Sequence, residues 1–130
     1  ALLNMGEQGY LDATRSIIAT GRKIRAGIAA IPELRLLGES LLVAAFTSDV
    51  FDAYALQDLL SARGWNLTGL QLPPGIHLGM TLRTAQPGVA DRFLADLRVL
   101  TEGRSNRRRR RCFAGIELDA YDCAYFLCHY

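Results

Sequence analysis

The amino-acid sequence predicts an α+β domain in which a mostly antiparallel sheet is covered by helices on one face. Its 130 residues hold apolar runs of both helical and strand periodicity. In chain order these runs read helix, strand, strand, helix, strand, strand, helix. Packing the helices on one face of the sheet is the economical arrangement for that order. The stretch 64–82, two alternating apolar runs on either side of Pro73-Pro74-Gly75, predicts a hairpin at its centre.

The first element is a long helix that follows a break at residues 6–9, Gly-Glu-Gln-Gly. Its apolar stripe consists of Tyr10, Ile17, Ile24, Ile28 and Ile31, widened by Leu11 and Ile18. The arginines at positions 15, 22 and 25 are expected mostly in solvent. Pro32 ends the pattern, because the residue before a proline avoids the helical region. A helix of some twenty residues spans roughly 30 Å, so this one is long enough to link two domains.

Two strands and a second helix are expected next. Residues 34–37 predict a short strand, residues 38–40 a turn, and the apolar run 41–47 a central strand. Ser48-Asp49 and Asp52 are candidate caps for a helix over 53–63. The buried stripe of that helix is expected to be Leu56, Leu59 and Leu60, and Gly64 suits a left-handed residue after its end.

The predicted hairpin spans residues 65–82. In its first run Trp65 and Leu67 share one face of a strand, whereas Leu70 and Leu72 share the opposite face. This change of face predicts a bulge at Gly69. The second run places Ile76, Leu78, Met80 and Leu82 on one face and His77, Gly79 and Thr81 on the other. A last helix is expected to start near Pro87, bury residues such as Phe93 and Leu97, and close at Glu102-Gly103.

Charge and cysteine are concentrated at the end of the chain. Residues 1–103 carry a net charge of about −1, and residues 104–130 carry about +3. All three cysteines lie in the second part, an odd number without a regular disulfide pattern. No apolar run reaches the length of a membrane span, and the start does not read as a signal peptide. We therefore expect a cytoplasmic protein without a membrane span. The first residues, Ala1-Leu2-Leu3-Asn4-Met5, resemble the end of a helix that began earlier, so we also expect the chain to be a piece of a larger one.

Several stretches together resemble the C-terminal region of the sphingosine-1-phosphate lyase family. The central stretches are Gly64-Trp65-Asn66-Leu67, Leu70-Gln71-Leu72-Pro73-Pro74 and Ile76-His77. Three further stretches match in the right order: Met5-Gly6-Glu7-x-Gly9-Tyr10 with Ala13-Thr14, Phe51-Asp52-x-Tyr54-x-Leu56, and Thr81-Leu82. The combination of Gly-Trp-Asn-Leu with Pro-Pro-x-Ile-His is the specific part. The resemblance covers about residues 1–100.

The resemblance implies a part of a pyridoxal-phosphate-dependent carbon–carbon lyase of fold type I, related to the group II decarboxylases. Residues 1–32 would be the end of a large-domain helix and a long interdomain helix, and residues 33–103 the small C-terminal α+β domain. Residues 104–130 are a basic, cysteine- and aromatic-rich tail of uncertain origin, divergent or out of frame. The family implies a homodimer, and a missing N-terminal large domain that holds the lysine bound to the cofactor.

The residues of this chain offer no cofactor or metal ligands of their own. Lys23, the single lysine, sits mid-helix near Arg22 and Arg25, so we expect an exposed side chain and no bound cofactor. His77 is the one catalytic candidate, facing a large domain or a channel, although a structural role is favoured. Trp65 is expected to pack in the core or at a domain interface and to donate its indole N–H to a carbonyl. Pro73-Pro74-Gly75 is expected to form a turn, which is compatible with one cis peptide bond. Asp49, Asp52 and Asp58 are not expected to form an acid–base pair.

The tail carries the most conspicuous motif, the run Arg107 to Arg111. Basic runs can bind nucleic-acid phosphates, but the resemblance ends near its start, and we expect no DNA or RNA partner. A zinc site from Cys123, Cys128 and His129 is disfavoured, because adjacent Cys128 and His129 chelate poorly and no fourth ligand is obvious in the sequence.

The leading hypothesis is therefore a C-terminal fragment, inactive alone, of an enzyme for retro-aldol cleavage of phosphorylated long-chain amino alcohols. One alternative is a fragment of a related pyridoxal-phosphate amino-acid decarboxylase. An alternative of another class is a free-standing α+β binding module with a basic tail.

Overall fold

The predicted α+β architecture is confirmed in a computed structural model, which describes residues 2–113 and, within them, the side chains of residues 4–105. Helix α1 (Leu2–Ala29) is followed by β1 (Arg35–Leu37), β2 (Val43–Thr47) and α2 (Ala53–Ala62). Strands β3 (Thr68–Gln71) and β4 (Pro74–Gly79) then precede helix α3 (Val89–Phe113). The four strands form one antiparallel sheet in the order β1-β2-β4-β3.

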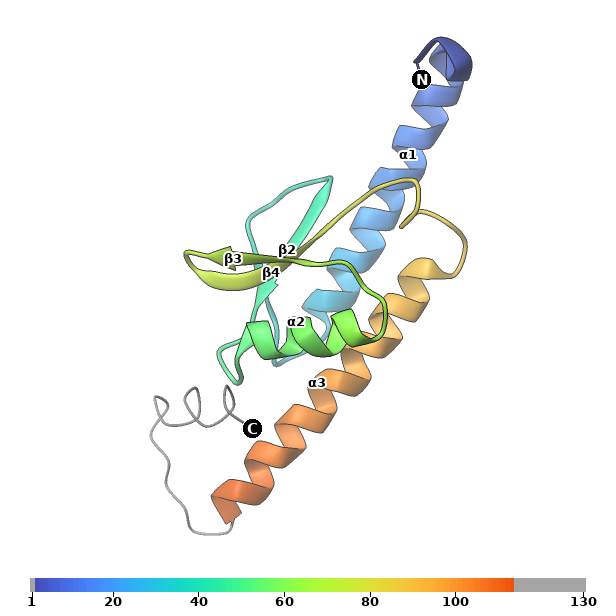
Figure 1. Ribbon diagram of the computed structural model, residues 1–130. Coiled ribbons are helices and arrows are strands. Elements are labelled where there is room, and N and C mark those ends of the chain that lie inside the picture. The colour runs from blue at the N-terminus through green and yellow to red at the C-terminus, as the bar shows by residue number, and fades with distance from the viewer. Residues whose placement is uncertain (1, 114–130) are drawn as a thin grey trace.

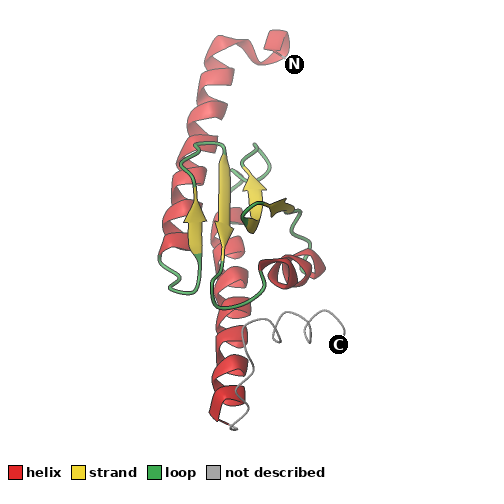
Figure 2. Cartoon of the chain, turned by 90° about the vertical axis from the view of Figure 1, so that its left-hand side faces the viewer, coloured by secondary structure: helices red, strands yellow, loops and turns green. Residues whose placement is uncertain are grey.

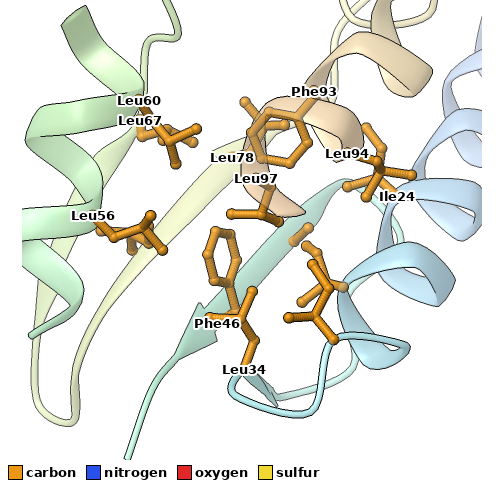
Figure 3. Close-up of a cluster of buried hydrophobic side chains, with 14 of the residues drawn as sticks. Ile24, Leu34, Phe46, Leu56, Leu60, Leu67, Leu78, Phe93, Leu94 and Leu97 are labelled. Carbon is orange, nitrogen blue, oxygen red and sulfur yellow. The ribbon is translucent and has the colours of Figure 1, made fainter. Parts of the chain in front are cut away.

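The helices lie on one side of the sheet, as expected. Figure 2 views the sheet with α1 and α3 behind it, and the core lies between these layers. Phe46 on β2, Ile76 on β4 and Phe93 on α3 are fully buried in that core. Leu56 and Leu60 of α2 and Ile24 of α1 belong to the same core, as Figure 3 shows.

Helix α1 packs on the domain only through its C-terminal half. Ile24, Ile28 and Ile31 are buried as predicted, whereas Tyr10 is 53% and Leu11 41% exposed. The prediction of a buried apolar stripe is therefore wrong for the first half of α1, whose apolar side chains do not pack on this chain. That half of the helix projects from the domain (Figure 1). The predicted break falls at Gly6, whose φ of 67° interrupts the helical backbone.

Helix α2 ends as its sequence predicts. Asp52 is the N-cap, and its side chain accepts a hydrogen bond from the Tyr54 backbone N–H. At the other end Gly64 has a φ of 89°, and the Gly64 and Trp65 N–H groups donate to the Ser61 and Leu60 carbonyls. This pattern is a Schellman motif, for which a glycine is the favoured residue. Leu59, predicted to be buried, lies at the helix surface with 36% exposure.

The hairpin differs from the prediction at three points. No bulge occurs at Gly69, which pairs with Ile76 in an unbroken register from Thr68 to Gln71. Gly69 instead lies close to α2: a Cβ there would lie 3.2 Å from Gln57 Oε1 and 3.3 Å from Tyr54 Cε1. Pro74 already belongs to β4, and the Leu72–Pro73 peptide bond is cis. Strand β4 ends at Gly79, so Leu82 lies beyond it.

The other boundaries moved by a few residues. Leu41 and Leu42, predicted in the central strand, precede β2 and are more than half exposed. Pro87 lies two residues before α3 instead of in its first turn. The prediction that Glu102-Gly103 closes this helix is wrong, because α3 continues to Phe113. Arg104 donates from Nη2 to the Ala55 carbonyl at 3.0 Å and lies over the Phe51 ring, which ties the continued helix to α2.

Candidate functional site

Trp65 joins the segment after α2 to helix α3. Its indole N–H donates to Asp96 Oδ2 at 2.8 Å, which corrects the prediction of a carbonyl acceptor. The ring meets Phe93 edge to face with centroids 5.1 Å apart, and the Arg92 guanidinium lies 5.0 Å from its centroid. Arg63 Nη1 donates to the other oxygen of Asp96 at 2.6 Å. Trp65 therefore has the predicted packing role, and its contacts fix the end of α2 against α3.

This junction makes the stability of the domain depend on the protonation state of Asp96. The hydrogen bond from Trp65 and the charges of Arg63 and Arg92 hold the pKa of Asp96 below its usual value of 3.8, although burial opposes them. A carboxyl group whose pKa is lowered by folding stabilises the folded state at pH values above its unfolded-state pKa. This contribution is lost as the pH falls through the lower folded-state pKa.

Asp96→Asn is expected to lower the free energy of unfolding by about 1–2 kcal/mol at neutral pH, since the charge-assisted bond is partly exposed to water. The difference between the variant and the original chain should shrink as the pH falls below 3.8. Urea unfolding followed by tryptophan fluorescence over a pH series measures this. A difference that stays constant down to acid pH would show that the charge of Asp96 plays no part.

His77 lies on the inner strand β4, on the face opposite the buried residues Ile76 and Leu78. No described helix covers that face of the sheet (Figure 2). Its cross-strand neighbours are Ala45 on β2 and Thr68 on β3. Along β4 the side-chain positions on the same face are Gly75 and Gly79, because every second residue of a strand shares a face. We call this surface the open face. The nearest positions to His77 on this face, along β4 and across to β2 and β3, thus carry small residues.

Two features of the open face have no explanation within the described residues. The His77 Nδ1 atom is buried, yet it has no hydrogen-bond partner among them. Gly79 has no positive φ, and a Cβ there would meet nothing within 4 Å. A strand glycine costs stability and often marks a site where another backbone or a ligand approaches closely. These two features make the open face a candidate contact surface.

Lys23 does not lie in a site for an aldehyde cofactor. Its Nζ is 2.8 Å from Asp91 Oδ1 of α3, and the side chain is 54% exposed. A lysine that forms an imine with a cofactor lies in a desolvated pocket, whereas Lys23 is exposed to water beside a carboxylate. The described residues therefore do not fit a pyridoxal phosphate anchored at Lys23.

The remaining sequence candidates have structural surroundings. Asp49 pairs with Arg35 at 3.3 Å instead of capping α2, and Ser48 Oγ accepts from the Val50 and Phe51 N–H groups. Asp58 lies exposed on α2. Among the described residues no group of His, Cys, Asp or Glu could hold a metal ion. Cys123, Cys128 and His129 of the disfavoured zinc site lie outside these residues, as do the side chains of Arg107 to Arg111.

Sequence reasoning missed one polar feature. Arg25, expected mostly in solvent, is half-buried, and its Nη2 donates to the Gly38 carbonyl at 2.8 Å. The spacing of Arg22 and Arg25 already places them on one side of the helix. Only the fold, however, brings the turn after β1 against them. Within residues 2–113 no helix has both the length and the apolar character for a bilayer span.

Comparison with solved structures defines the class of protein. The sphingosine-1-phosphate lyase of Burkholderia pseudomallei matches with a TM-score of 0.76 and 41% identity, over 88% of this chain and 26% of that one. A mutant of the cystine C–S lyase C-DES, solved with glycine covalently linked to the pyridoxal-phosphate cofactor, matches with a TM-score of 0.55 over 67% of this chain and 23% of that one. Its 18% identity supports the fold alone. The chain is thus an α+β domain of the kind found in fold-type-I pyridoxal-phosphate enzymes.

Sequence relatives give the family. Sphingosine-1-phosphate lyase of Drosophila melanogaster is 45% identical over 101 residues, which are 77% of this chain and 18% of the relative. Sphingosine-1-phosphate lyase 1 of Rattus norvegicus is 41% identical over 99 residues, 75% of this chain and 17% of the relative. No family model matches. The chain belongs to the sphingosine-1-phosphate lyase family and matches a C-terminal portion of it, less than a fifth of these relatives' length.

Proposed function

We propose that the chain acts as the small C-terminal domain of a pyridoxal-phosphate-dependent lyase that cleaves phosphorylated long-chain amino alcohols. The observation that carries this proposal is the joint match in sequence and fold to a sphingosine-1-phosphate lyase, at 41% identity over 88% of the chain. When bound, the cofactor supplies an electron sink for the cleaved carbon–carbon bond. The relatives described above are sphingosine-1-phosphate lyases, which favours cleavage over amino-acid decarboxylation.

The chain is proposed to be inactive alone, because the cofactor lysine would lie in the larger part of the parent enzyme. Its single lysine, Lys23, is half exposed and paired with Asp91, which supports this division. The proposal includes a homodimeric parent in the cytoplasm, with the projecting half of α1 joining this domain to the large one.

The open face is proposed to dock on that large domain. The matched Burkholderia chain is about four times as long as the part covered here, so most of the parent polypeptide lies outside this domain. A segment of that polypeptide would explain both unexplained features. It would lie close against Gly79, where no side chain stands in the way, and it would give the buried Nδ1 of His77 a hydrogen-bond partner. His77 would then position the two domains.

A chimeric enzyme tests the function. Residues 5–100 replace the matching portion of the Burkholderia lyase, and cleavage of sphingosine-1-phosphate is assayed by the release of aldehyde. We expect cleavage within about tenfold of the natural enzyme, because the chemistry is carried by the large domain. A matched control takes the corresponding portion of C-DES, which shares the fold without the sequence, and is expected to be inactive. A folded chimera that holds its cofactor but cleaves no substrate would refute the assignment.

A further inference from the structure

A second polar site lies on the side of α1, between this helix and the loop from β1 to β2. It is a pocket of about 450 Å³ lined by Arg22, Arg25, Glu39, Ser40 and Leu41. Residues three apart on a helix are surface neighbours, so both arginines face the pocket from the same side. The loop is pressed against the helix at Gly21, where a Cβ would lie 2.8 Å from the Leu41 carbonyl oxygen. The absence of a side chain at Gly21 therefore lets the loop lie against the helix and form one wall of the pocket.

The guanidinium group of Arg25 is held in place but only partly satisfied. Its Nη2 donates to the Gly38 carbonyl at 2.8 Å, in a turn where Gly38 has a φ of 64°. Its Nη1 is buried and has no acceptor among the described residues. A buried, charged donor without an acceptor is unfavourable, and native proteins nearly always give such a group a partner. Arg25 therefore keeps hydrogen-bonding capacity that the described residues do not use.

The other polar groups of the pocket are unengaged too. No ion pair within 4.0 Å joins Glu39 to Arg22 or Arg25, and no hydrogen bond within the described residues involves Arg22 or the Ser40 hydroxyl. The lining therefore carries two positive charges and one negative charge, with free donors on three side chains. Its net charge of about +1 favours an anionic ligand.

We propose that this pocket binds a phosphate group, either as a free phosphate monoester or as the headgroup of a phospholipid. Arginine matches phosphate oxygens with pairs of parallel N–H groups, and two guanidinium groups in one pocket suit an ion with several charged oxygens. Arg25 provides the fixed donor, Arg22 the second charge, and Ser40 Oγ a hydroxyl donor. The half-exposed Leu41 leaves the pocket open on one side, where the rest of a monoester would extend. This site is separate from the open face and does not rest on the proposed lyase function.

The test is a titration of the 130-residue chain with inorganic phosphate at constant ionic strength, followed by the amide NMR signals of residues 21–41. We expect saturable shifts that sodium chloride at matched ionic strength does not produce. Arg25→Ala is expected to weaken binding by roughly tenfold or more, and Arg25→Lys to restore only part of it, because lysine lacks the planar fork. Glu39→Gln should tighten binding by about two- to fivefold, since it removes the like charge.

Arg98→Ala is the matched control, because Arg98 is an exposed arginine of α3 outside the pocket. It should leave phosphate binding unchanged. Phosphorylethanolamine and phosphatidylcholine vesicles containing phosphatidic acid distinguish the two sources of the phosphate group. Binding of the soluble ester assigns a free metabolite, and Arg25-dependent sedimentation with the acidic vesicles alone assigns a headgroup. Equal weakening by Arg25→Ala and Arg98→Ala, or no shift at residues 21–41 with any probe, would overturn the proposal.

Discussion

Phe46→Ala is expected to lower the free energy of unfolding by about 3–5 kcal/mol, the largest single effect of any core substitution proposed here. Phe46 is fully buried in β2 and pairs with Leu36 on one side and Ile76 on the other. Its ring lies where the sheet meets the helices, so its removal leaves a cavity that no single element can close (Figure 3). Urea unfolding followed by circular dichroism measures the change.

Two further variants keep this prediction testable if Phe46→Ala fails to fold. Phe46→Leu retains most of the apolar volume and should cost about 1–2 kcal/mol. Val99→Ala removes an apolar side chain that is 55% exposed on α3 and should cost no more than about 0.5 kcal/mol. A loss below about 1 kcal/mol for Phe46→Ala would mean that the core is not organised around β2.

Gly75→Ala is expected to destabilise the domain by about 1–3 kcal/mol through overpacking. A Cβ at Gly75 would lie 2.9 Å from the Phe46 carbonyl oxygen and 3.1 Å from Leu37 Cδ1. The first of these atoms belongs to the backbone of β2, so the clash is relieved only if β2 and β4 move apart. Thermal or urea unfolding of the variant gives the magnitude.

Gly79→Ala is the matched control, because Gly79 lies on the same strand and face as Gly75. A Cβ there has open space and the backbone has an ordinary φ, so we expect a change between zero and a gain of about 1 kcal/mol. Equal destabilisation by the two substitutions would show that strand propensity, and not the contact with β2, sets the cost. The contrast also shows why Gly79 is of interest: stability of the isolated domain does not require it.

The sequence predicts best those elements whose signals are local. Helix α2 lies within one residue of its expected range, because Asp52 caps its start and Gly64 ends it. The bulge predicted at Gly69 was wrong because a change in the alternation of apolar residues has two possible causes. It occurs where a strand bulges and also where a neighbouring helix lies close to the strand. In the structure Tyr54 and Gln57 of α2 occupy that space, and no local pattern contains this information.

The end of the last helix was missed for a similar reason. A glycine within a helix costs only about 1 kcal/mol relative to alanine, which a few tertiary contacts can offset. Thr101 is buried with its hydroxyl on the Leu97 carbonyl, and Arg104 contacts Phe51 and the Ala55 carbonyl on α2. These contacts on both sides of Gly103 stabilise the continued helix. The division of the chain at residues 32 and 103 stays a prediction.

The candidate sites were partly readable from the sequence. Strand periodicity placed His77 opposite the core residues Ile76 and Leu78, which the structure bears out. The unsatisfied Nδ1 of His77 and the empty space at Gly79 depend on which elements cover the sheet, so they became visible only in the folded chain. The same holds for Arg25, whose role depends on a loop thirteen residues away.

The proposed docking of the open face on the large domain of the parent lyase is tested by Gly79→Trp in the chimeric enzyme. In the isolated chain this substitution should leave the unfolding midpoint nearly unchanged, because a side chain at Gly79 points into open space. In the chimera we expect a loss of sphingosine-1-phosphate cleavage of roughly a hundredfold or more, because the domains would no longer close in register. The conservative Gly79→Ala should lose less. Full cleavage by a chimera carrying Gly79→Trp would contradict the docking of this face.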